Sequence, residues 1–363
     1  MVASPPDSLP NDERMARWRL VRSGRVGPAT VVALVERHGS ARQAIAALAE
    51  RPDGPALVAE TAVAEELRRL QAIGASALVW GDPDYPPGLA ALADPPIVLA
   101  AMGRRDLLAR PAVAIVGARN ASGAGRRFAE TIARELAEAG FCVVSGMARG
   151  IDAAAHRGSL AGGTIGVVAT GIDRVYPEEN RALHEAVAQD GLLLAESEPG
   201  TGPEARNFPR RNRIVAGLAL GVVVVEAAER SGSLITARLA AEQGREVFAV
   251  PGSPLDPRCK GTNGLIRAGA MLIESAGDVI ETLRPQTRPQ ARRATARTER
   301  PETAETAAEP SERIMEQLGP TPLSVDELVR QCQLSQAAVA AILLDLELQG
   351  RIERHPGQKV SLR

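Results

Sequence analysis

The sequence has few cysteines, few aromatic residues and no apolar run long enough to cross a membrane. Its three cysteines form no CxxC pair and its four histidines show no HExxH spacing, so neither a disulfide framework nor a metal site is indicated. The longest apolar run, Ala216 to Val225, is about half of the roughly 20 residues that span a bilayer. The stretch from Met1 to Trp18 is polar and lacks the apolar core of a signal peptide, so we expect a cytoplasmic protein with no membrane contact.

The chain also lacks an excess of charge of either sign. Its 43 basic and 44 acidic side chains give a net charge of −1, which excludes a polybasic protein that coats nucleic acid over its whole surface. Binding to a phosphate polymer would therefore need a local patch. Lys260 and Lys359 are the only lysines, and arginine supplies all the other positive charge. The planar guanidinium group suits phosphate and does not deprotonate.

Composition divides the chain into five segments. Residues 1–13 are expected to be a flexible tail, and residues 14–75 carry short helical patterns around the turn from Gly24 to Pro28. That turn resembles a helix-hairpin-helix, whose backbone N–H groups can meet phosphate. An ordinary small helical cap, or a SAM-like helical domain, explains the same pattern.

Residues 76–284 alternate β-branched runs with amphipathic helical stretches, which predicts an α/β domain. Seven strands are predicted, at Ala112–Val116, Phe141–Ser145, Ile165–Ala169, Leu192–Glu196, Gly221–Val225, Glu246–Val250 and Met271–Ile273. These runs are apolar throughout, so we expect a Rossmann-like, doubly wound and mostly parallel sheet covered by helices. Such a sheet binds ligands at the carboxyl ends of its strands, near the topological switch point. The proline-rich stretch from Trp80 to Gly103 is interpreted as a connector.

The C-terminal part divides into a linker and a small module. Residues 285–311 carry Pro, Thr, Arg and Glu with little apolar content, which indicates a disordered linker. Residues 312–363 are predicted to form a winged helix, with three helical stretches followed by a hairpin at Arg351–Leu362. The third helix, Gln336–Gln349, has acidic residues and no Lys or Arg. We therefore expect this module to contact protein before duplex DNA, with only the basic wing leaving the duplex option open.

The turn after the first predicted strand has the chemistry of an anion site. The glycine-rich segment from Gly117 to Gly125 feeds a helix N-terminus, where free N–H groups and the helix dipole favour negative charge. Arg119 and Ser122 add side-chain donors. The segment does not match GxGxxG, no acidic residue ends the second strand, and no P-loop sequence occurs. The sequence thus predicts a phosphate site without a dinucleotide clamp, and no cofactor.

The turn after the second predicted strand adds a further cation at the same edge. Gly146 permits a close backbone approach and Arg149 supplies the charge. Asp152 is best explained as a helix N-cap, and His156, one helical turn further on, as a structural histidine on a helix face.

The densest basic cluster follows the fourth predicted strand and opens a helix. Arginines for the phosphates beside an aromatic ring for a base are typical of single-strand binding. The cluster consists of Phe208, Arg210, Arg211, Asn212 and Arg213. In the alternative interpretation, one or two of these arginines brace the loop or a dimer, and Phe208 fills the core. Ser231 and Ser233 open another helix N-terminus as a second phosphate cradle, and Lys260 lies in a glycine-flanked loop, either as a contact or as a solvated lysine.

Taken together, these loops form a series of motifs in a fixed order. The series is Gly117-Ala118-Arg119, Ser145-Gly146-Met147-Ala148-Arg149-Gly150-Ile151-Asp152, Phe208-Pro209-Arg210-Arg211-Asn212-Arg213, Ser231-Gly232-Ser233-Leu234-Ile235-Thr236, Pro251-Gly252 and Gly261-Thr262-Asn263. It resembles the DNA-processing protein A family (DprA, also called Smf), most strongly over residues 78–284. The resemblance implies a non-enzymatic, dimeric protein that binds incoming single-stranded DNA, protects it and loads the RecA recombinase during natural transformation or recombination.

The resemblance also suggests roles for single residues. Arg119 matches a phosphate-contacting arginine, and the segment from Phe208 to Arg213 matches the lining of the strand-binding pocket. Ala118 stands where a serine is common, which implies a weaker phosphate contact in the first loop.

Two other functions remain open at this point. One is a nucleotide hydrolase on a similar scaffold, such as the LOG-type phosphoribohydrolases, which needs a carboxylate beside a glycine-rich loop. Residues 231–238 supply no Asp or Glu, which ranks this function second. The other is a winged-helix transcription factor, which the acidic third helix of the C-terminal module disfavours.

Overall fold

A computed structural model describes residues 9–287 except positions 25, 52 and 53, and then residues 323–325, 339, 342, 343, 346, 347, 351–355 and 359–362. The chain divides into two compact units, Met1–Gln290 and Ala291–Arg363, and each is described by itself.

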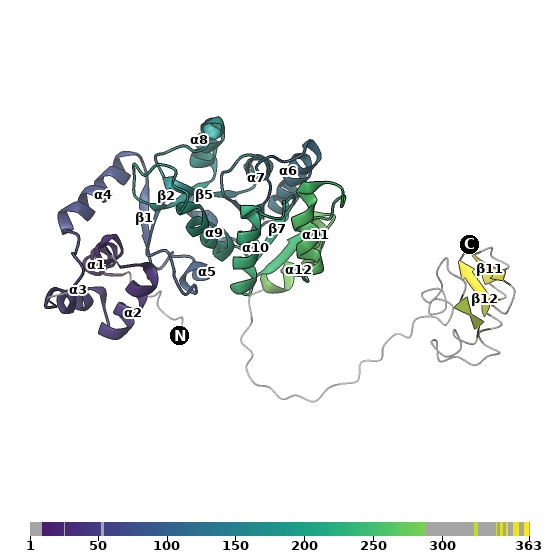
Figure 1. Ribbon diagram of the computed structural model, residues 1–363, viewed down its shortest axis with the longest axis horizontal. Helices are drawn as coiled ribbons and strands as arrows, with labels where there is room; N and C mark the ends of the chain where they lie inside the picture. Colours follow the sequence, from purple (N-terminus) through teal and green to yellow (C-terminus); the bar gives the residue numbers. More distant parts are fainter. Residues whose placement is uncertain are drawn as a thin grey trace, which may run out of the picture. The chain divides into compact units, whose positions relative to one another are not determined.

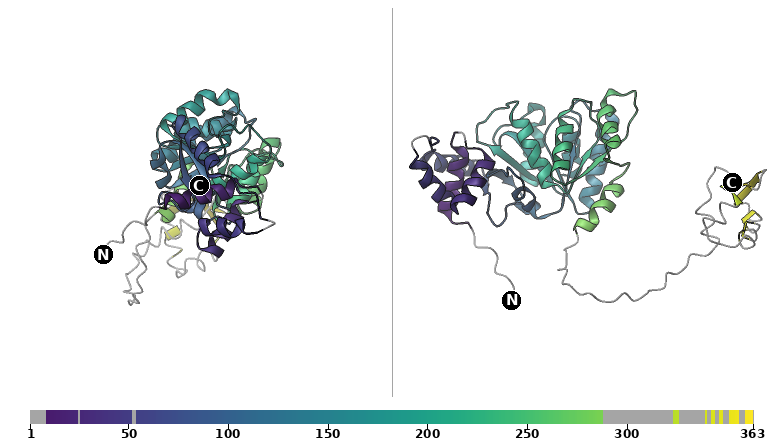
Figure 2. Two further views of the ribbon diagram at one scale, coloured as in Figure 1. Left: turned by 90° about the vertical axis from the view of Figure 1, so that its left-hand side faces the viewer. Right: turned by 60° about the horizontal axis from the view of Figure 1, so that its bottom comes forward.

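The first unit begins with four helices that share one apolar core. They are α1 (Asn11–Arg22), α2 (Pro28–His38), α3 (Ala41–Ala49) and α4 (Glu60–Ala72). Helix α1 therefore begins inside the predicted tail. Trp18 and Leu20 are buried in this core, and the Trp18 indole donates a hydrogen bond of 2.9 Å to Glu66 of α4. Figure 2 shows these helices, in purple, packed beside one end of the sheet.

A nine-stranded sheet forms the centre of the unit. Its strands are β1 (Ser76–Val79), β2 (Val98–Gly103), β3 (Ala112–Val116), β4 (Cys142–Ser145), β5 (Thr164–Gly171), β6 (Leu192–Ser197), β7 (Gly221–Val224), β8 (Glu246–Ala249) and β9 (Met271–Leu272). Their order is β1-β2-β6-β5-β4-β3-β7-β8-β9, and the strands from β6 to β9 run parallel. All seven predicted strands are confirmed, and the switch point lies between β3 and β7.

Strand β2 corrects the interpretation of Trp80–Gly103 as a connector, and β1, which lies just before this stretch, was also not predicted. Strand β2 pairs antiparallel with both β1 and β6 and extends the sheet towards the helical part. The prolines of this stretch precede β2 and form the connection between β1 and β2, which carries the short helix α5 (Pro87–Ala90). They masked the strand that follows them, because proline argues locally against strand structure.

Helices cover both faces of the sheet (Figure 1). Alternation along β3 sets the two faces, because Ala114 and Val116 pack on one side and Val113 and Ile115 on the other. One face carries α9 (Asn207–Leu218) and α10 (Gly232–Glu242). The opposite face carries α6 (Gly123–Glu138), α7 (Ile151–Ser159) and α12 (Ala276–Thr287). Helix α8 (Arg181–Asp190) contacts β2 and β6, and α11 (Lys260–Arg267) contacts β8.

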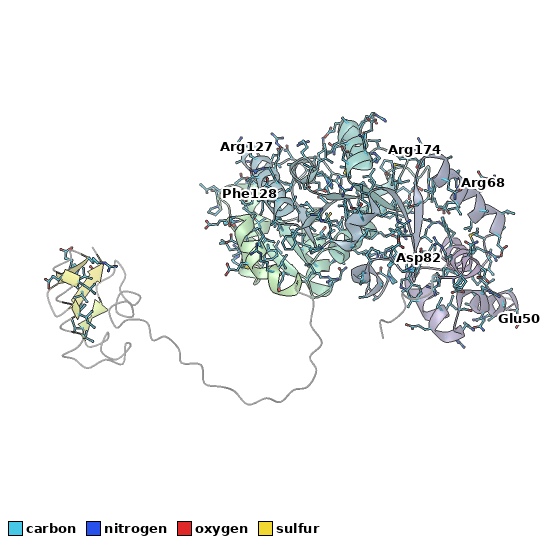
Figure 3. The ribbon with its side chains drawn as sticks, turned by 180° about the vertical axis from the view of Figure 1, so that it is seen from behind. Glu50, Arg68, Asp82, Arg127, Phe128 and Arg174 are labelled. Carbon is cyan, nitrogen blue, oxygen red and sulfur yellow. The ribbon has the colours of Figure 1, made fainter. Side chains whose placement is uncertain are left out.

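Charged side chains of α1 attach the helical part to the first strand of the sheet. Arg14 contacts Asp82 at 3.3 Å, and the Arg17 guanidinium lies 4.7 Å from the centre of the Trp80 ring. Figure 3 shows Asp82 between the helices and the sheet. Several partners across this junction fix the position of the helical part against the sheet.

The second unit contains the predicted hairpin. Strands β11 (Ile352–His355) and β12 (Lys359–Leu362) pair antiparallel, and β10 (Leu323–Ser324), which was not predicted, pairs with β12. The predicted helices at 314–318, 325–332 and 336–349 lie mostly outside the described residues, as does most of the predicted linker. No helix within the described ranges is long and apolar enough to cross a membrane.

Candidate nucleic-acid interface

The loops after β3 and β4 lie against each other at the carboxyl edge of the sheet. The Ile151 N–H donates to the Ala118 carbonyl at 3.3 Å. A Cβ atom on Gly117 would come within 2.6 Å of the Ile151 side chain, so this position has no room for a larger residue. The close packing of the two loops brings Arg119 and Arg149 to one edge, as predicted.

Arg119 lies over an aromatic pair at this edge. Its guanidinium carbon is 5.1 Å from the centre of the Phe208 ring, and that ring packs edge-on against Tyr176 with 5.8 Å between ring centres. Arg119 is exposed and makes no hydrogen bond or ion pair with any residue that the structure describes. Its positive charge is therefore free to meet an anion, while the rings offer apolar surface to a base.

These residues surround a pocket of about 260 Å³, which we call the Phe208 pocket. Its lining consists of Arg119, Gly146, Ala148, Arg149, Ala169, Thr170, Tyr176, Pro177, Phe208 and Arg211. A neighbouring hollow of about 570 Å³, the α10 pocket, shares Arg119, Phe208 and Arg211 and continues towards Arg230 and Ser231 at the start of α10. Together the two pockets are lined by one carboxylate, Asp152, and by five arginines, Arg119, Arg149, Arg211, Arg230 and Arg258.

Arg211 is buried and reaches from α9 to the end of β4 and to the middle of β5. Strand β4 ends at Ser145, so the carbonyls of Gly146 and Val167 lie past the β4–β5 ladder. The Arg211 Nη1 atom donates to both of these carbonyls, to Val167 at 2.6 Å, and Nε donates to the Asn212 side chain at 3.2 Å. The Arg211 side chain lines both the Phe208 pocket and the α10 pocket. Its Nη2 atom has no hydrogen-bond partner among the described residues.

Asp152 is a buried carboxylate that interacts electrostatically with Arg211 without a direct ion pair between the two side chains. Burial raises the pKa of Asp152, and Arg211 opposes that rise. Burial likewise lowers the pKa of Arg211 to about 10, against the effect of Asp152. The two shifts have the same cause, because removing either charge from water disfavours its ionised form. The pair holds a cation at the floor of the site at a fixed position.

The expected role of Asp152 as a helix N-cap is wrong. Helix α7 begins at Ile151 after Gly150, and the Asp152 carboxylate accepts the N–H groups of Gly146 and Ala148, at 3.1 and 3.4 Å. The carboxylate thus closes the β4–α7 loop upon itself. In this loop Met147 adopts a φ of 58°, and its carbonyl accepts a hydrogen bond of 2.9 Å from Asn180.

Ser122 and Gly146 also differ from their predicted roles. The N–H and Oγ atoms of Ser122 donate to the Glu226 carboxylate at 2.9 and 2.5 Å, and Ser122 caps α6 through the Gly125 N–H. An internal carboxylate therefore occupies the position predicted for a phosphate at this helix N-terminus. Gly146 is small because the Arg211 guanidinium lies where its Cβ would be.

Arg213 and Arg210 of the basic cluster, and Arg149 of the β4–α7 loop, differ in burial and in their ion-pair partners. Arg213 is buried between Glu196 and Asp94, with an Nη2–Oε1 distance of 2.5 Å to Glu196, so it serves the fold and not a ligand. Arg210 is exposed and contacts Glu196 only at 3.7 Å, on the side of α9 that faces the helical part. Arg149 is exposed and contacts Glu179 at 3.4 Å.

The other predicted contacts lie at the margin of the site. Asn212, Ser231 and Ser233 line the α10 pocket, where the Ser231 hydroxyl is bonded to that of Ser233 at 2.7 Å. Lys260 is exposed at the start of α11 and lines neither the Phe208 pocket nor the α10 pocket. Among the described residues, no group of three His, Cys, Asp or Glu side chains is placed to hold a metal ion.

Three residues of the site were missed. Tyr176, one of only two tyrosines, completes the aromatic pair. Asn180 supports the Met147 conformation, and Glu226 occupies the α6 N-terminus. Tyr176 could have been found as an aromatic residue after a predicted strand, whereas the other two depend on contacts distant in sequence.

The fold and the site define a Rossmann-like protein that presents arginines and aromatic rings at the ligand edge of its sheet. Residues 76–284 match the family described as DNA recombination-mediator protein A, residues 11–68 the DprA-like N-terminal HHH domain, and residues 298–358 the DprA winged helix domain. The first match covers more than half of the chain, so the chain belongs to the DprA/Smf family. The predicted fold class, with helical, Rossmann-like and winged-helix parts, is thereby confirmed.

Individual relatives agree with this assignment. The chain is 46% identical to DNA processing protein DprA of Bacillus subtilis over 202 residues, covering 55% of this chain and 68% of that protein. The structure of DprA from Streptococcus pneumoniae has a TM-score of 0.65 at 33% identity and covers 74% of this chain and 97% of that chain. DprA from Helicobacter pylori, described with a single-stranded DNA binding mode, has a TM-score of 0.54 at 34% identity and covers 58% of this chain and 96% of that chain.

Proposed function

We propose that the chain binds single-stranded DNA at the Phe208 pocket and the α10 pocket. The observation that carries the proposal is the exposed, unpaired Arg119 guanidinium over the Phe208–Tyr176 pair. A cation beside aromatic rings accepts a phosphate and a base at once, and it does so without reading sequence. The single-strand binding described for the Helicobacter pylori relative supports the same assignment.

We further propose that the bound strand is protected and passed to the RecA recombinase, and that the chain acts as a homodimer. Family membership supports the role as a recombination mediator. For the dimer, the open sheet edge at β9 offers support, because Met271 and Leu272 on this strand are 42% and 46% exposed. An edge strand with apolar side chains in water favours pairing with another chain.

Fluorescence anisotropy with labelled oligonucleotides tests the DNA proposal. If one protomer neutralises about three phosphates, the logarithm of the affinity falls with the logarithm of salt at a slope near −2. Single strands of several sequences should bind alike, and a duplex of the same length should compete poorly. Equal affinity for duplex and single strand, or a slope near zero, would contradict the proposal.

One observation favours a hydrolase as second candidate. Asp152 lines the α10 pocket as a carboxylate whose pKa is raised by burial, which is a property of general acids. Its Oδ2 atom is, however, occupied by two backbone N–H groups. Release of free base from a nucleotide by the purified protein, abolished by Asp152→Asn, would establish this activity.

A further inference from the structure

A cleft of about 700 Å³ lies between the helical part and the sheet, beside the proposed DNA site. The ends of α1 and the start of α2 form one wall, with Arg22, Gly27 and Pro28. Strands β5 and β6 and helix α9 form the other, with Glu196, Asn207, Arg210 and Arg211 among its residues. The turn before α2 resembles a helix-hairpin-helix turn, which can contact phosphate, and the proposed DNA site does not include it.

The cleft adjoins the proposed DNA site, because Ala169 and Arg211 line both the cleft and the Phe208 pocket. Arg211 lines the cleft, the Phe208 pocket and the α10 pocket, so the three hollows meet at its side chain. A polymer in the Phe208 pocket is therefore close to the cleft, and α9 contributes lining residues to both.

Two side chains of α9 in the cleft have hydrogen-bonding groups that the described residues do not fully pair. Asn207 is only 8% exposed, yet its side-chain amide has no hydrogen-bond partner among the described residues. Its amide atoms are not fully enclosed, so they are available to a ligand or water in the cleft. Arg210 is half-exposed on the same wall, with its one ion pair stretched to 3.7 Å.

The charge of the lining indicates which chemical group fits. Glu198 and Glu204 stand in the same cleft as Arg206 and Arg210, so the cleft is polar and not simply cationic. A bare phosphate would meet these carboxylates unfavourably. A nucleotide fits better, because the amino groups of a base donate to carboxylates and amides while its phosphate meets an arginine. The first turn of α2 adds open N–H groups, since no side chain caps this helix.

We propose that this cleft is a second subsite for the same single-stranded DNA, in which a base lies against Asn207 and its phosphate against Arg210. The helical part then contacts the strand directly, through the start of α2. This inference rests on the proposed function, since the strand enters the cleft from the Phe208 pocket.

The test compares oligodeoxycytidylates of increasing length, from 3 to 20 nucleotides, by anisotropy on the full chain, because cytosine carries the amino group that the cleft is proposed to accept. Arg210→Ala should lower the affinity for the 20-mer roughly fivefold or more, which is the effect expected from losing one nucleotide contact. The affinity for the shortest oligomer that binds should not change. Arg134→Ala is the matched control, because Arg134 is 54% exposed against 53% for Arg210, with a similarly long ion pair of 3.4 Å to Glu138. It lies towards the C-terminal end of α6, away from the cleft.

A second variant tests the base. Both the wild-type chain and Asn207→Ala should lose affinity with an abasic 20-mer, because it also lacks the base that contacts Phe208, but Asn207→Ala should lose less than the wild-type chain because its cleft contact with a base is already gone. If Arg210→Ala and Asn207→Ala bind single strands as tightly as the wild type does, while Arg119→Ala binds more weakly, the cleft subsite is refuted and the proposed function still holds. Unchanged binding by Arg119→Ala refutes the proposed function itself. An equal loss for Arg134→Ala shows a general charge effect and also overturns the subsite.

Discussion

Arg119→Ala separates DNA binding from stability more cleanly than any other arginine variant of this edge. The side chain is exposed and its only described contact is the Phe208 ring at 5.1 Å. An exposed cation–π contact contributes about 0.5–1 kcal/mol, so the free energy of unfolding should fall by at most about 1 kcal/mol. Binding should change much more, because a hydrogen bond to a charged phosphate contributes about 1.5 kcal/mol or more, a roughly tenfold loss of affinity.

The salt dependence makes this prediction specific. With about three phosphates neutralised the slope is near −2, and with about two it is near −1.4 at about 0.7 per phosphate of a single strand. Anisotropy across a salt series measures the slope, and urea denaturation measures the stability. A tenfold loss of affinity with an unchanged slope would mean that Arg119 positions the Phe208 ring and does not contact phosphate. Phe208→Leu, alone and combined with Arg119→Ala, would then measure the coupling of the two side chains.

Three further variants test other features of the site. Arg211→Ala should lower the free energy of unfolding by about 1–3 kcal/mol, because it removes the hydrogen bonds to the Gly146 and Val167 carbonyls and the positive charge that favours ionised Asp152, and a normal urea midpoint would refute this role. Glu226→Ala should free the donors of Ser122 at the α6 N-terminus, so millimolar inorganic phosphate should raise the melting temperature of this variant and not that of the wild type. Burial lowers the pKa of His156 to about 3 from 6.5, so below pH 6.5 the unfolded chain binds a proton that the fold does not. Compared with His156→Asn, the wild type should lose about 1.4 kcal/mol of stability per pH unit between pH 6 and 4, and parallel pH profiles would contradict this.

The strands and the ligand edge could be predicted from the sequence because both follow from local patterns. Apolar β-branched runs give buried parallel strands, and parallel strands bring their following loops to one edge. Arg119, Arg149, Phe208 and Arg211 were placed together on this reasoning, and all four line the Phe208 pocket. Strand β2 escaped prediction because the prolines that precede it suggested a loop.

The hydrogen-bond partners of the polar side chains could not be predicted, because these partners are far away in the sequence. Ser122 meets Glu226 across 104 positions, and Arg211 meets Gly146 across 65. Nothing near Ser122 indicates that a carboxylate already occupies its helix N-terminus. The pattern gives the edge at which a donor lies, while the tertiary packing decides whether the donor is still available.

Helix α9 shows why a basic cluster cannot be treated as one binding surface. Successive residues of a helix point in directions about 100° apart, so neighbouring arginines reach different parts of the protein. Arg213 forms ion pairs with Glu196 and Asp94, and Arg210 lines the cleft. Arg211 points inward and donates to the Val167 carbonyl below the site.

The buried position of Arg211 makes it a better anchor at the DNA site than the exposed Arg119. Its Nη1 and Nε atoms are fixed by the chain, so little side-chain entropy is lost when Nη2 meets a ligand, whereas the exposed Arg119 must be ordered on binding. Arg211→Lys tests this argument, because a lysine keeps the charge beside Asp152 but cannot donate to two carbonyls and a ligand from a fixed plane. The variant should stay folded and bind single strands more weakly. Wild-type affinity for Arg211→Lys would show that only the charge of Arg211 matters and not its fixed geometry.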